Sequence, residues 1–349
     1  MHKVLFVGLR ALGDMVLTMS ALQSVHDTCP DSQIDYLMER PYEALFSEEP
    51  IIRKVISLPR SVCTSPDSPI VSKMKYLRFL QRIRSERYDV VFDLFSRGPR
   101  SRIIVGASHA RRRVGIMDHP VPLLDSWIYT DRVRLPNAIT QMFDQMQYVT
   151  GRLGFRSHNP FPTLTVHPEN TQKARSLLGS FPSEGNGRFL AVLPGSGMNN
   201  KNWPADSFVE LIRHLMHRKV SVLLIGGPND RQSVGDIIKA FPKETPLFKW
   251  IIQADLPTLK GIFALSSGVA GNDSGPLHLA QAVGKKAVAL FGPGDHVSYR
   301  PFIGSLVRKG LACSPCQSFA NQCPDNQCMK SIKVEDVLRE LQEQEMLSS

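Results

Sequence analysis

The sequence has no apolar run close to the roughly 20 residues that a membrane-spanning helix needs, so we expect no transmembrane anchor. The short apolar run at residues 4–7 is typical of a first strand and not of a signal peptide. Cysteine is scarce, six in 349 residues, and we expect the thiols to stay reduced in the cytoplasm. Acidic residues number 32 against 42 Lys and Arg, and the net charge of +10 predicts an anionic partner: a phosphorylated substrate, an acidic membrane surface or nucleic acid.

The pattern of apolar residues predicts an α/β fold. Short runs rich in β-branched residues alternate with segments of helical period, which is typical of a mainly parallel sheet flanked by helices. In the first half we expect strands at residues 4–7, 34–38, 55–58 and 89–94, and helices at 15–27 and 73–84. In the second half we expect strands at 189–193, 220–225, 268–271 and 287–291, and helices at 205–218, 231–241, 258–265 and 276–283.

A dense group of prolines and glycines marks a linker between the two halves, at residues 151–168 and again at 180–188. We therefore predict two Rossmann-like lobes with mainly parallel sheets facing a central cleft. The first lobe spans residues 1–165 and the second residues 166–349. The last predicted helix, residues 334–347, can pack on either lobe.

The loop after the first predicted strand contains Arg10, Gly13 and Asp14, and a helix follows at once. Loops at the carboxyl ends of parallel strands are where α/β folds bind ligands. A carboxylate there can accept a proton from a substrate hydroxyl. The alternative is that Asp14 only caps the helix, because Asp is a favoured N-cap residue.

Two loops of the second half are candidates for binding a phosphate. The first contains Gly195, Ser196, Gly197 and Lys201, but it lacks the Gly-Lys-Ser/Thr ending of a Walker loop, and a plain turn before a helix is the alternative. In the second, Asp273 ends a strand and Ser274, Gly275 and Pro276 open a helix, whose free N–H groups and positive dipole favour an anion. His278 lies one turn into that helix, either as a ligand of the anion or as a packed core side chain.

Taken together, these segments resemble the heptosyltransferases that build the inner core of lipopolysaccharide. The resemblance rests on Arg10-x-x-Gly13-Asp14, Lys201-x-Trp203-Pro204, Asn272-Asp273-Ser274-Gly275-x-x-His278 and Leu290-Phe291-Gly292-Pro293, and it runs from about residue 3 to residue 340. It implies a GT-B fold, with the acceptor in the N-terminal lobe and the nucleotide-sugar in the C-terminal lobe. It also implies an inverting transfer that requires no cofactor.

The resemblance carries roles onto particular residues. Asp14 would be the base that removes the proton of the acceptor hydroxyl. Lys201, Ser274, Gly275 and His278 would hold the diphosphate, and Asp273 would touch the transferred sugar. The backbone from Leu256 to Thr258 would seat the adenine. Where relatives often carry Glu beside the nucleotide ribose, this chain offers Asp230, and another activated sugar is the alternative donor.

An arginine-rich segment lies in the first lobe. Between Leu94 and Met117 it contains six arginines and no acidic residue. Arginine binds phosphate and carboxylate in a bidentate way, which suits an anionic glycolipid acceptor, and a solvated basic face is the alternative. The candidate acceptor residues are Arg10, Arg97, Arg100, Arg111, Arg112 and Arg113. Nucleic acid is disfavoured because no known binding module is present.

Four cysteines follow one another as Cys313-x2-Cys316-x6-Cys323-x4-Cys328. Four thiolates at such spacings can close a tetrahedral structural metal site, although the paired C-x2-C spacing of a strong zinc signature is missing. Reduced thiols and a local disulfide are the alternatives.

The sequence thus predicts a cytoplasmic glycosyltransferase, attached peripherally to the inner face of the cytoplasmic membrane, that moves heptose from ADP-heptose to an inner-core lipopolysaccharide acceptor. One alternative is a sugar-nucleotide epimerase of the same fold, which would need no acceptor. Another is a nucleotide-sugar or phosphate-binding module without turnover, in which Asp14 is only a cap.

Overall fold

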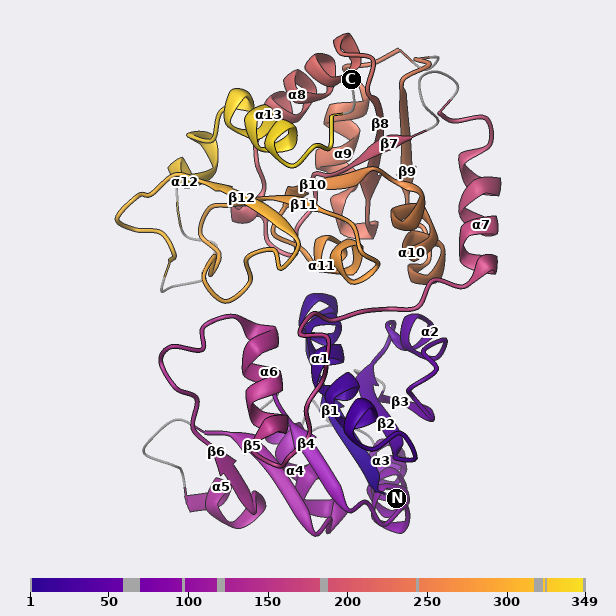
Figure 1. The fold of residues 1–349 in the computed structure, drawn as a ribbon, viewed down its shortest axis with the longest axis vertical. Helices are drawn as coiled ribbons and strands as arrows, with labels where there is room; N and C mark the ends of the chain where they lie inside the picture. The colour runs from indigo at the N-terminus through magenta and orange to yellow at the C-terminus, as the bar shows by residue number, and fades with distance from the viewer. Residues whose placement is uncertain are drawn as a thin grey trace. The chain divides into compact units, whose positions relative to one another are not determined.

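The structure is a computed structural model that describes residues 2–58, 70–95, 98–117, 123–182, 188–242, 245–316, 323 and 325–347. The chain divides into two compact units, Met1–Thr165 and Val166–Ser349. Each unit is built on one six-stranded parallel sheet with helices on both faces (Figure 1). The predicted α/β fold is therefore confirmed. No helix among the described residues combines the length and the apolar character needed to cross a membrane.

The sheet of the N-terminal unit has the strand order β3-β2-β1-β4-β5-β6. Every neighbouring pair is parallel, and Val4 of β1 faces Ile34 on one side and Val90 on the other. The strands are β1 Lys3–Gly8, β2 Gln33–Glu39, β3 Lys54–Leu58, β4 Val90–Asp93, β5 Arg112–Ile116 and β6 Asp131–Val133. The chain order reverses between β1 and β4, so the loops after these two strands border the switch point at which such sheets bind ligands.

The helices of this unit are α1 Leu12–Thr28, α2 Glu43–Phe46, α3 Ile70–Ser85, α4 Pro99–Ser108, α5 Leu123–Ile128 and α6 Met142–Gly151. Right-handed crossovers place α3, α4 and α5 on one face of the sheet. There Tyr76 of α3 and Ile104 of α4 pack with Leu5 and Val91 in one buried cluster. On the other face α1 and α6 lie side by side (Figure 1).

The sheet of the C-terminal unit has the order β12-β11-β10-β7-β8-β9, which is the same winding as in the N-terminal unit. Its strands are β7 Phe189–Leu193, β8 Ser221–Gly226, β9 Phe248–Ile252, β10 Gly268–Asn272, β11 Ala287–Phe291 and β12 Gly304–Arg308. Its helices are α7 Pro168–Leu178, α8 Ala205–His217, α9 Arg231–Ile238, α10 Leu256–Leu265, α11 Gly275–Ala282, α12 Gln327–Lys330 and α13 Val334–Glu343, with short 3-10 turns η1 Asn199–Lys201 and η2 Pro228–Asp230. The helix α13 packs on α8, β11 and β12, so it belongs to this unit.

The structure contains strands that the apolar pattern did not predict, among them β5, β6, β9 and β12. These strands lie toward the edges of their sheets, where burial is partial and the apolar run is short. The strand β5 also begins with Arg112 and Arg113, which the sequence analysis named as candidate acceptor-binding residues.

Candidate functional site

The candidate donor site lies at the carboxyl edge of the C-terminal sheet, where the strand order reverses between β7 and β10. The loop after β7 brings Lys201 to this point, and the loop after β10 brings Asp273. The ammonium of Lys201 donates to the carboxylate of Asp273 at 2.7 Å, and the side chains are 19% and 10% exposed. Two predicted residues that are 72 positions apart in the chain therefore form one ion pair.

The loop after β11 closes around this ion pair at Gly294. A Cβ placed on Gly294 would lie 2.8 Å from Oδ2 of Asp273 and 3.4 Å from Nζ of Lys201. A side chain here would therefore displace the ion pair. Gly294 is a candidate site residue that the sequence analysis did not name, although the neighbouring Gly292 and Pro293 belong to the motif.

The amino end of α11 faces the same edge. Ser274 is its N-cap, yet the Ser274 side chain makes no capping hydrogen bond. Among the described residues, the buried Oγ of Ser274 and Nδ1 of His278 have no hydrogen-bond partner. An unpaired buried polar atom is unfavourable, so both atoms are available for a ligand. Burial lowers the pKa of His278, which outweighs the opposing effect of Asp273, and the imidazole is neutral at pH 7.

Asn272, which is fully buried, holds the loop after β7 in place. Its Nδ2 donates to the carbonyl of Pro194 at 2.7 Å, and its Oδ1 accepts from the backbone N–H of Trp203 at 3.1 Å. The hydroxyl of Ser196 lies 2.6 Å from the carbonyl oxygen of Met198, so it serves the shape of the loop. Asn272 thus positions Lys201 by fixing both ends of its loop, a function that the sequence motif did not reveal.

The neighbouring strands β8 and β9 place two further predicted residues along this edge. Oδ2 of Asp230 accepts from the backbone N–H of Gly227 at 2.8 Å, and a Cβ on Gly195 would overlap the Asp230 carboxylate. Gly195 therefore makes room for Asp230. Leu256 is the first residue of α10 and is half-buried, directly after the N-cap Asp255. Gly197 has open space around its Cα.

In the N-terminal unit, Asp14 lies at the carboxyl edge, in the first turn of α1. The N-cap of this helix is Ala11, which has no capping side chain, and Asp14 is the third helical residue and half-buried. Asp14 is therefore not the N-cap residue. A negative charge is favourable in the first turn of a helix because of the helix dipole.

Arg10 and Arg100 lie at the same edge as Asp14. Nε of Arg10 donates to the carbonyl of Phe95 at 3.0 Å, which joins the loops after β1 and β4 across the switch point. Arg100, in the first turn of α4, forms an ion pair with Glu39 at 2.6 Å. The predicted residue Arg97 lies outside the described residues.

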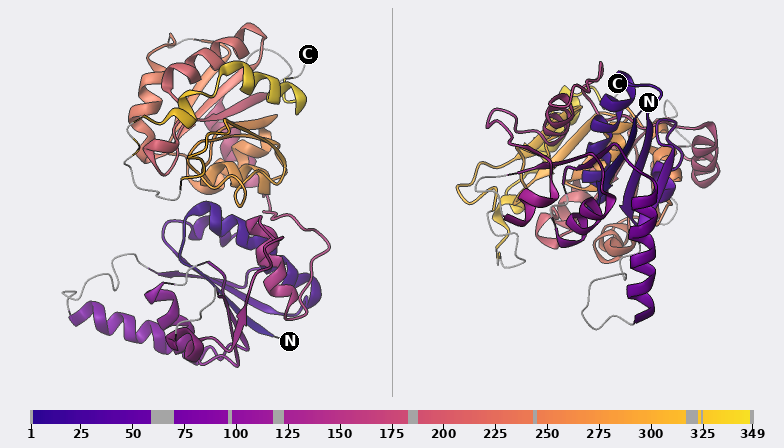
Figure 2. Two further views of the ribbon diagram at one scale, coloured as in Figure 1. Left: turned by 90° about the vertical axis from the view of Figure 1, so that its left-hand side faces the viewer. Right: turned by 90° about the horizontal axis from the view of Figure 1, so that it is seen from below.

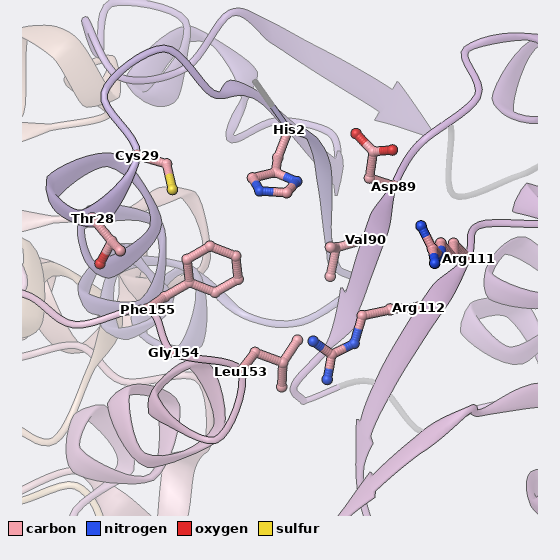
Figure 3. Close-up of a pocket in the computed structure, with 10 residues that line it drawn as sticks. All are labelled: His2, Thr28, Cys29, Asp89, Val90, Arg111, Arg112, Leu153, Gly154 and Phe155. Atoms are coloured by element: carbon pink, nitrogen blue, oxygen red, sulfur yellow. The ribbon is translucent and has the colours of Figure 1, made fainter.

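The other predicted acceptor residues lie at the amino edge of the sheet. In the sheet register, Arg112 on β5 lies level with Val90 on β4 and with Val4 on β1. Gly8, which ends β1 just before the loop to Asp14, lies four residues beyond Val4, about 13 Å along the strand. Arg112 and Arg111 line a cavity of about 450 Å³ together with His2 and Phe155 (Figure 3).

The side chains of two of these arginines have partners within the fold. Arg112 forms an ion pair with Asp131 at 2.6 Å. Arg113 donates to the carbonyl of Ile128 at 2.5 Å and to that of Ala110 at 2.8 Å. The structure therefore does not bring Arg111, Arg112 and Arg113 together with Asp14. Asp131 begins β6 and Ile128 ends α5, so these two partners are set by the packing of the chain and not by the spacing of the arginines.

The four cysteines of the C-terminal segment are free thiols. Cys316 lies beside the loop after β11, because its backbone N–H donates to the carbonyl of Pro293 at 3.0 Å. The buried Sγ of Cys328 lies 3.0 Å from the position of a Cβ on Gly292. Burial and the neighbouring thiols raise the pKa of Cys316 and of Cys328. Within the described ranges no group of three or more His, Cys, Asp or Glu side chains is arranged to hold a metal ion, so a metal at these cysteines stays a prediction.

Two doubly wound units, each with candidate residues at its switch point, define the architecture of a GT-B glycosyltransferase. The comparisons with known proteins specify the family: residues 76–328 match glycosyltransferase family 9 (heptosyltransferase), and the chain belongs to this family. It is 24% identical over 306 residues to lipopolysaccharide heptosyltransferase 3 of Escherichia coli (strain K12), covering 86% of this chain and 85% of that protein.

Solved structures show the same fold. The structure of E. coli ADP-heptose lps heptosyltransferase II has a TM-score of 0.78 at 19% identity, covering 99% of this chain and 98% of that chain. The structure of E. coli heptosyltransferase WaaC with ADP has a TM-score of 0.76 at 17% identity, covering 98% and 99%. The predicted family, the GT-B fold and the glycosyltransferase class are therefore confirmed.

Proposed function

We propose that the chain is an inverting heptosyltransferase that moves a heptose from ADP-heptose to an anionic inner-core lipopolysaccharide acceptor. Family membership supports the reaction class, and the names of its relatives support the two substrates. A related enzyme was solved with ADP, and its fold matches this chain over nearly its whole length. The proposed location is the inner face of the cytoplasmic membrane, where such an acceptor is made.

The observation that carries the donor assignment is the convergence at the amino end of α11. A cation on Lys201, unpaired buried polar atoms on Ser274 and His278, and the amino end of α11 at Gly275 all lie at one sheet edge. The backbone N–H groups in the first turn of a helix have no partner within the helix. We assign the diphosphate to these groups. The negative charge that grows on the leaving diphosphate is stabilised there, because the donors are already oriented.

The remaining donor residues follow from their places along the edge. Asp273 is assigned to the transferred sugar, since its carboxylate lies beside the proposed diphosphate site. Asp230, which follows β8, is assigned to the ribose, and the backbone at Leu256, which follows β9, is assigned to the adenine. Each of these strands lies one position further from β10 in the sheet than the strand before it. Gly195, Ser196 and Gly197 form the loop that carries Lys201.

Asp14 is assigned the role of general base. The acceptor hydroxyl attacks the anomeric carbon while the bond to the diphosphate breaks, and the proton of the hydroxyl passes to the Asp14 carboxylate. A single displacement of this kind inverts the anomeric configuration. Arg10 and Arg100 are assigned to the anionic acceptor because they share the edge with Asp14. Arg111, Arg112 and Arg113 are not part of this proposal.

The test is incubation of the protein with ADP-heptose and a heptose-deficient core acceptor, with ADP release and glycan mass as readouts. We expect both to rise together. Release of ADP without an acceptor would indicate hydrolysis, and a changed free nucleotide-sugar would favour the epimerase. Binding of ADP-heptose without any product would favour a module that only binds.

The Asp14→Asn variant tests the base. We expect donor affinity to stay within about twofold while kcat falls by about 10²–10⁴-fold, because only proton transfer is removed. Asp206→Asn is the matched control, since Asp206 is also an Asp in a first helical turn, in α8, and is exposed. Full transfer by Asp14→Asn would remove Asp14 from its assigned role.

A further inference from the structure

The outer surface of the N-terminal unit carries an unusual group of exposed apolar side chains. Among the described residues, eight large hydrophobic side chains are exposed, and five of them lie on α3, α4 and α5. These five are Met74 (49% exposed), Leu77 (58%), Ile103 (48%), Leu123 (82%) and Trp127 (82%). We call them the outer apolar group. The other three, Leu177, Ile252 and Val297, lie in the C-terminal unit on different elements.

The helices α3 and α5, which carry four of these five side chains, also make buried contacts with the rest of the unit. On α3, Tyr76 and Ile83 are buried in the core, so Met74 and Leu77 point away from it. On α5, the buried Asp125 forms an ion pair with Nε of Arg102 at 2.5 Å, which fastens α5 to α4. Trp127, two residues along from Asp125, is therefore exposed on an anchored helix.

Unpaired positive charge accompanies the apolar side chains of α3. The helix α3 contains no acidic residue, and its basic residues are Lys73, Lys75, Arg78, Arg82 and Arg84. All five are exposed, and no ion pair joins any of them to another described residue. The nearby acid Glu86 is already paired with Lys3, Arg53 and Lys54. Figure 2 shows α3 standing out from its unit.

We propose that the outer surface of α3, α4 and α5 docks the protein onto a bilayer that contains anionic lipids. This rests on the proposed function, in which the acceptor is a glycolipid. Lys and Arg are attracted to anionic headgroups, while Trp and Leu enter the interfacial layer, and the two contributions together give stable but reversible attachment. Tryptophan is favoured at this depth because its ring is apolar and its N–H is polar.

Charge complementarity favours a bilayer over a second copy of this chain. Two copies joined through this surface would bring ten cationic side chains of α3 together, and like charges oppose such contact. Self-association is an outcome that the experiment distinguishes.

The experiment measures co-sedimentation of the full chain with phosphatidylcholine vesicles, with and without about one third phosphatidylglycerol. The vesicles contain no acceptor, so binding is read independently of sugar transfer. We expect binding to the anionic vesicles only, with a partition coefficient that falls at least tenfold at high salt. We expect a further tenfold loss in Leu123→Ser/Trp127→Ser and in Lys73→Gln/Lys75→Gln/Arg78→Gln.

Matched controls use exposed residues of the C-terminal unit. Leu177→Ser/Ile252→Ser removes two exposed apolar side chains elsewhere and should leave the partition coefficient unchanged. The fluorescence of Trp127 should shift to the blue on vesicle binding, and this shift should be absent from Trp127→Phe. Transfer to a water-soluble, deacylated acceptor should stay at the wild-type rate in all these variants, which separates membrane docking from catalysis.

Three results would overturn the docking proposal. One is the absence of binding to anionic vesicles by a well-folded wild-type protein. Another is a loss of binding in the C-terminal control equal to that in Leu123→Ser/Trp127→Ser. The third is a wild-type dimer in solution that becomes a monomer in Leu123→Ser/Trp127→Ser, because the surface would then be a protein interface.

Discussion

The ion pair between Lys201 and Asp273 joins the two loops of the donor site, and its removal gives a quantitative prediction. Lys201→Met leaves the Asp273 carboxylate, which is only 10% exposed, without its 2.7 Å partner. Breaking a fully buried pair by removing one partner costs about 3–5 kcal/mol. Because both side chains retain some contact with water, we expect a smaller loss of about 1–3 kcal/mol in the free energy of unfolding of the C-terminal unit.

A double-mutant cycle isolates the pair. Asp273→Asn should cost less than Lys201→Met, since a lysine side chain can turn its ammonium toward solvent. The double variant should recover stability relative to Lys201→Met, with a coupling energy of at least about 1 kcal/mol. Urea unfolding followed by fluorescence is suitable in a Trp127→Phe background. The chain has three tryptophans, and the two that remain in this background, Trp203 and Trp250, both lie in the C-terminal unit.

Activity gives a second and independent readout of the same pair. If Lys201 stabilises the leaving diphosphate, Lys201→Met should lower kcat/KM for ADP release by about 10²–10³-fold. Additive unfolding energies in the cycle, together with unchanged kcat/KM, would refute both the coupling and the assignment of Lys201 to the donor.

Two further predictions concern the same unit. Gly271→Ala should destabilise it by about 2–3 kcal/mol, because the new Cβ would overlap the carbonyl oxygen of Leu193 on β7. Gly235→Ala should stabilise it by about 0.5–1 kcal/mol, because the position lies inside α9 and has open space for a Cβ. Equal midpoints of urea unfolding for the two variants would contradict this prediction. The buried His278 has a pKa lowered from 6.5, so the unfolded state takes up the proton first, and stability should fall as the pH drops below about 6.5. Urea unfolding between about pH 7.5 and pH 5 should therefore show a shallower loss in His278→Gln than in the wild type, and identical slopes would show that burial does not hold His278 neutral.

Local pattern was sufficient for much of the fold and of the donor site. Apolar runs and helical periods identified the central strands and most of the helices, because burial imposes these periods along the chain. The Ser274-Gly275-Pro276 start of α11 was recognisable because a helix amino end has a local composition. The motifs also identified the family, which the match over residues 76–328 confirms.

Only the tertiary structure decided which of the candidate residues meet. Strand order brings Lys201 to Asp273 and places Asn272 under the loop that carries Lys201, and pairing between distant strands has no local signature. The arginines illustrate the same limit. The sequence analysis assigned them to the anionic acceptor, but the register of β5 places Arg112 and Arg113 at the opposite end of the sheet from Asp14, where carbonyl oxygens and Asp131 bind their side chains. A charge is visible in the sequence, whereas its partner is set by three-dimensional packing.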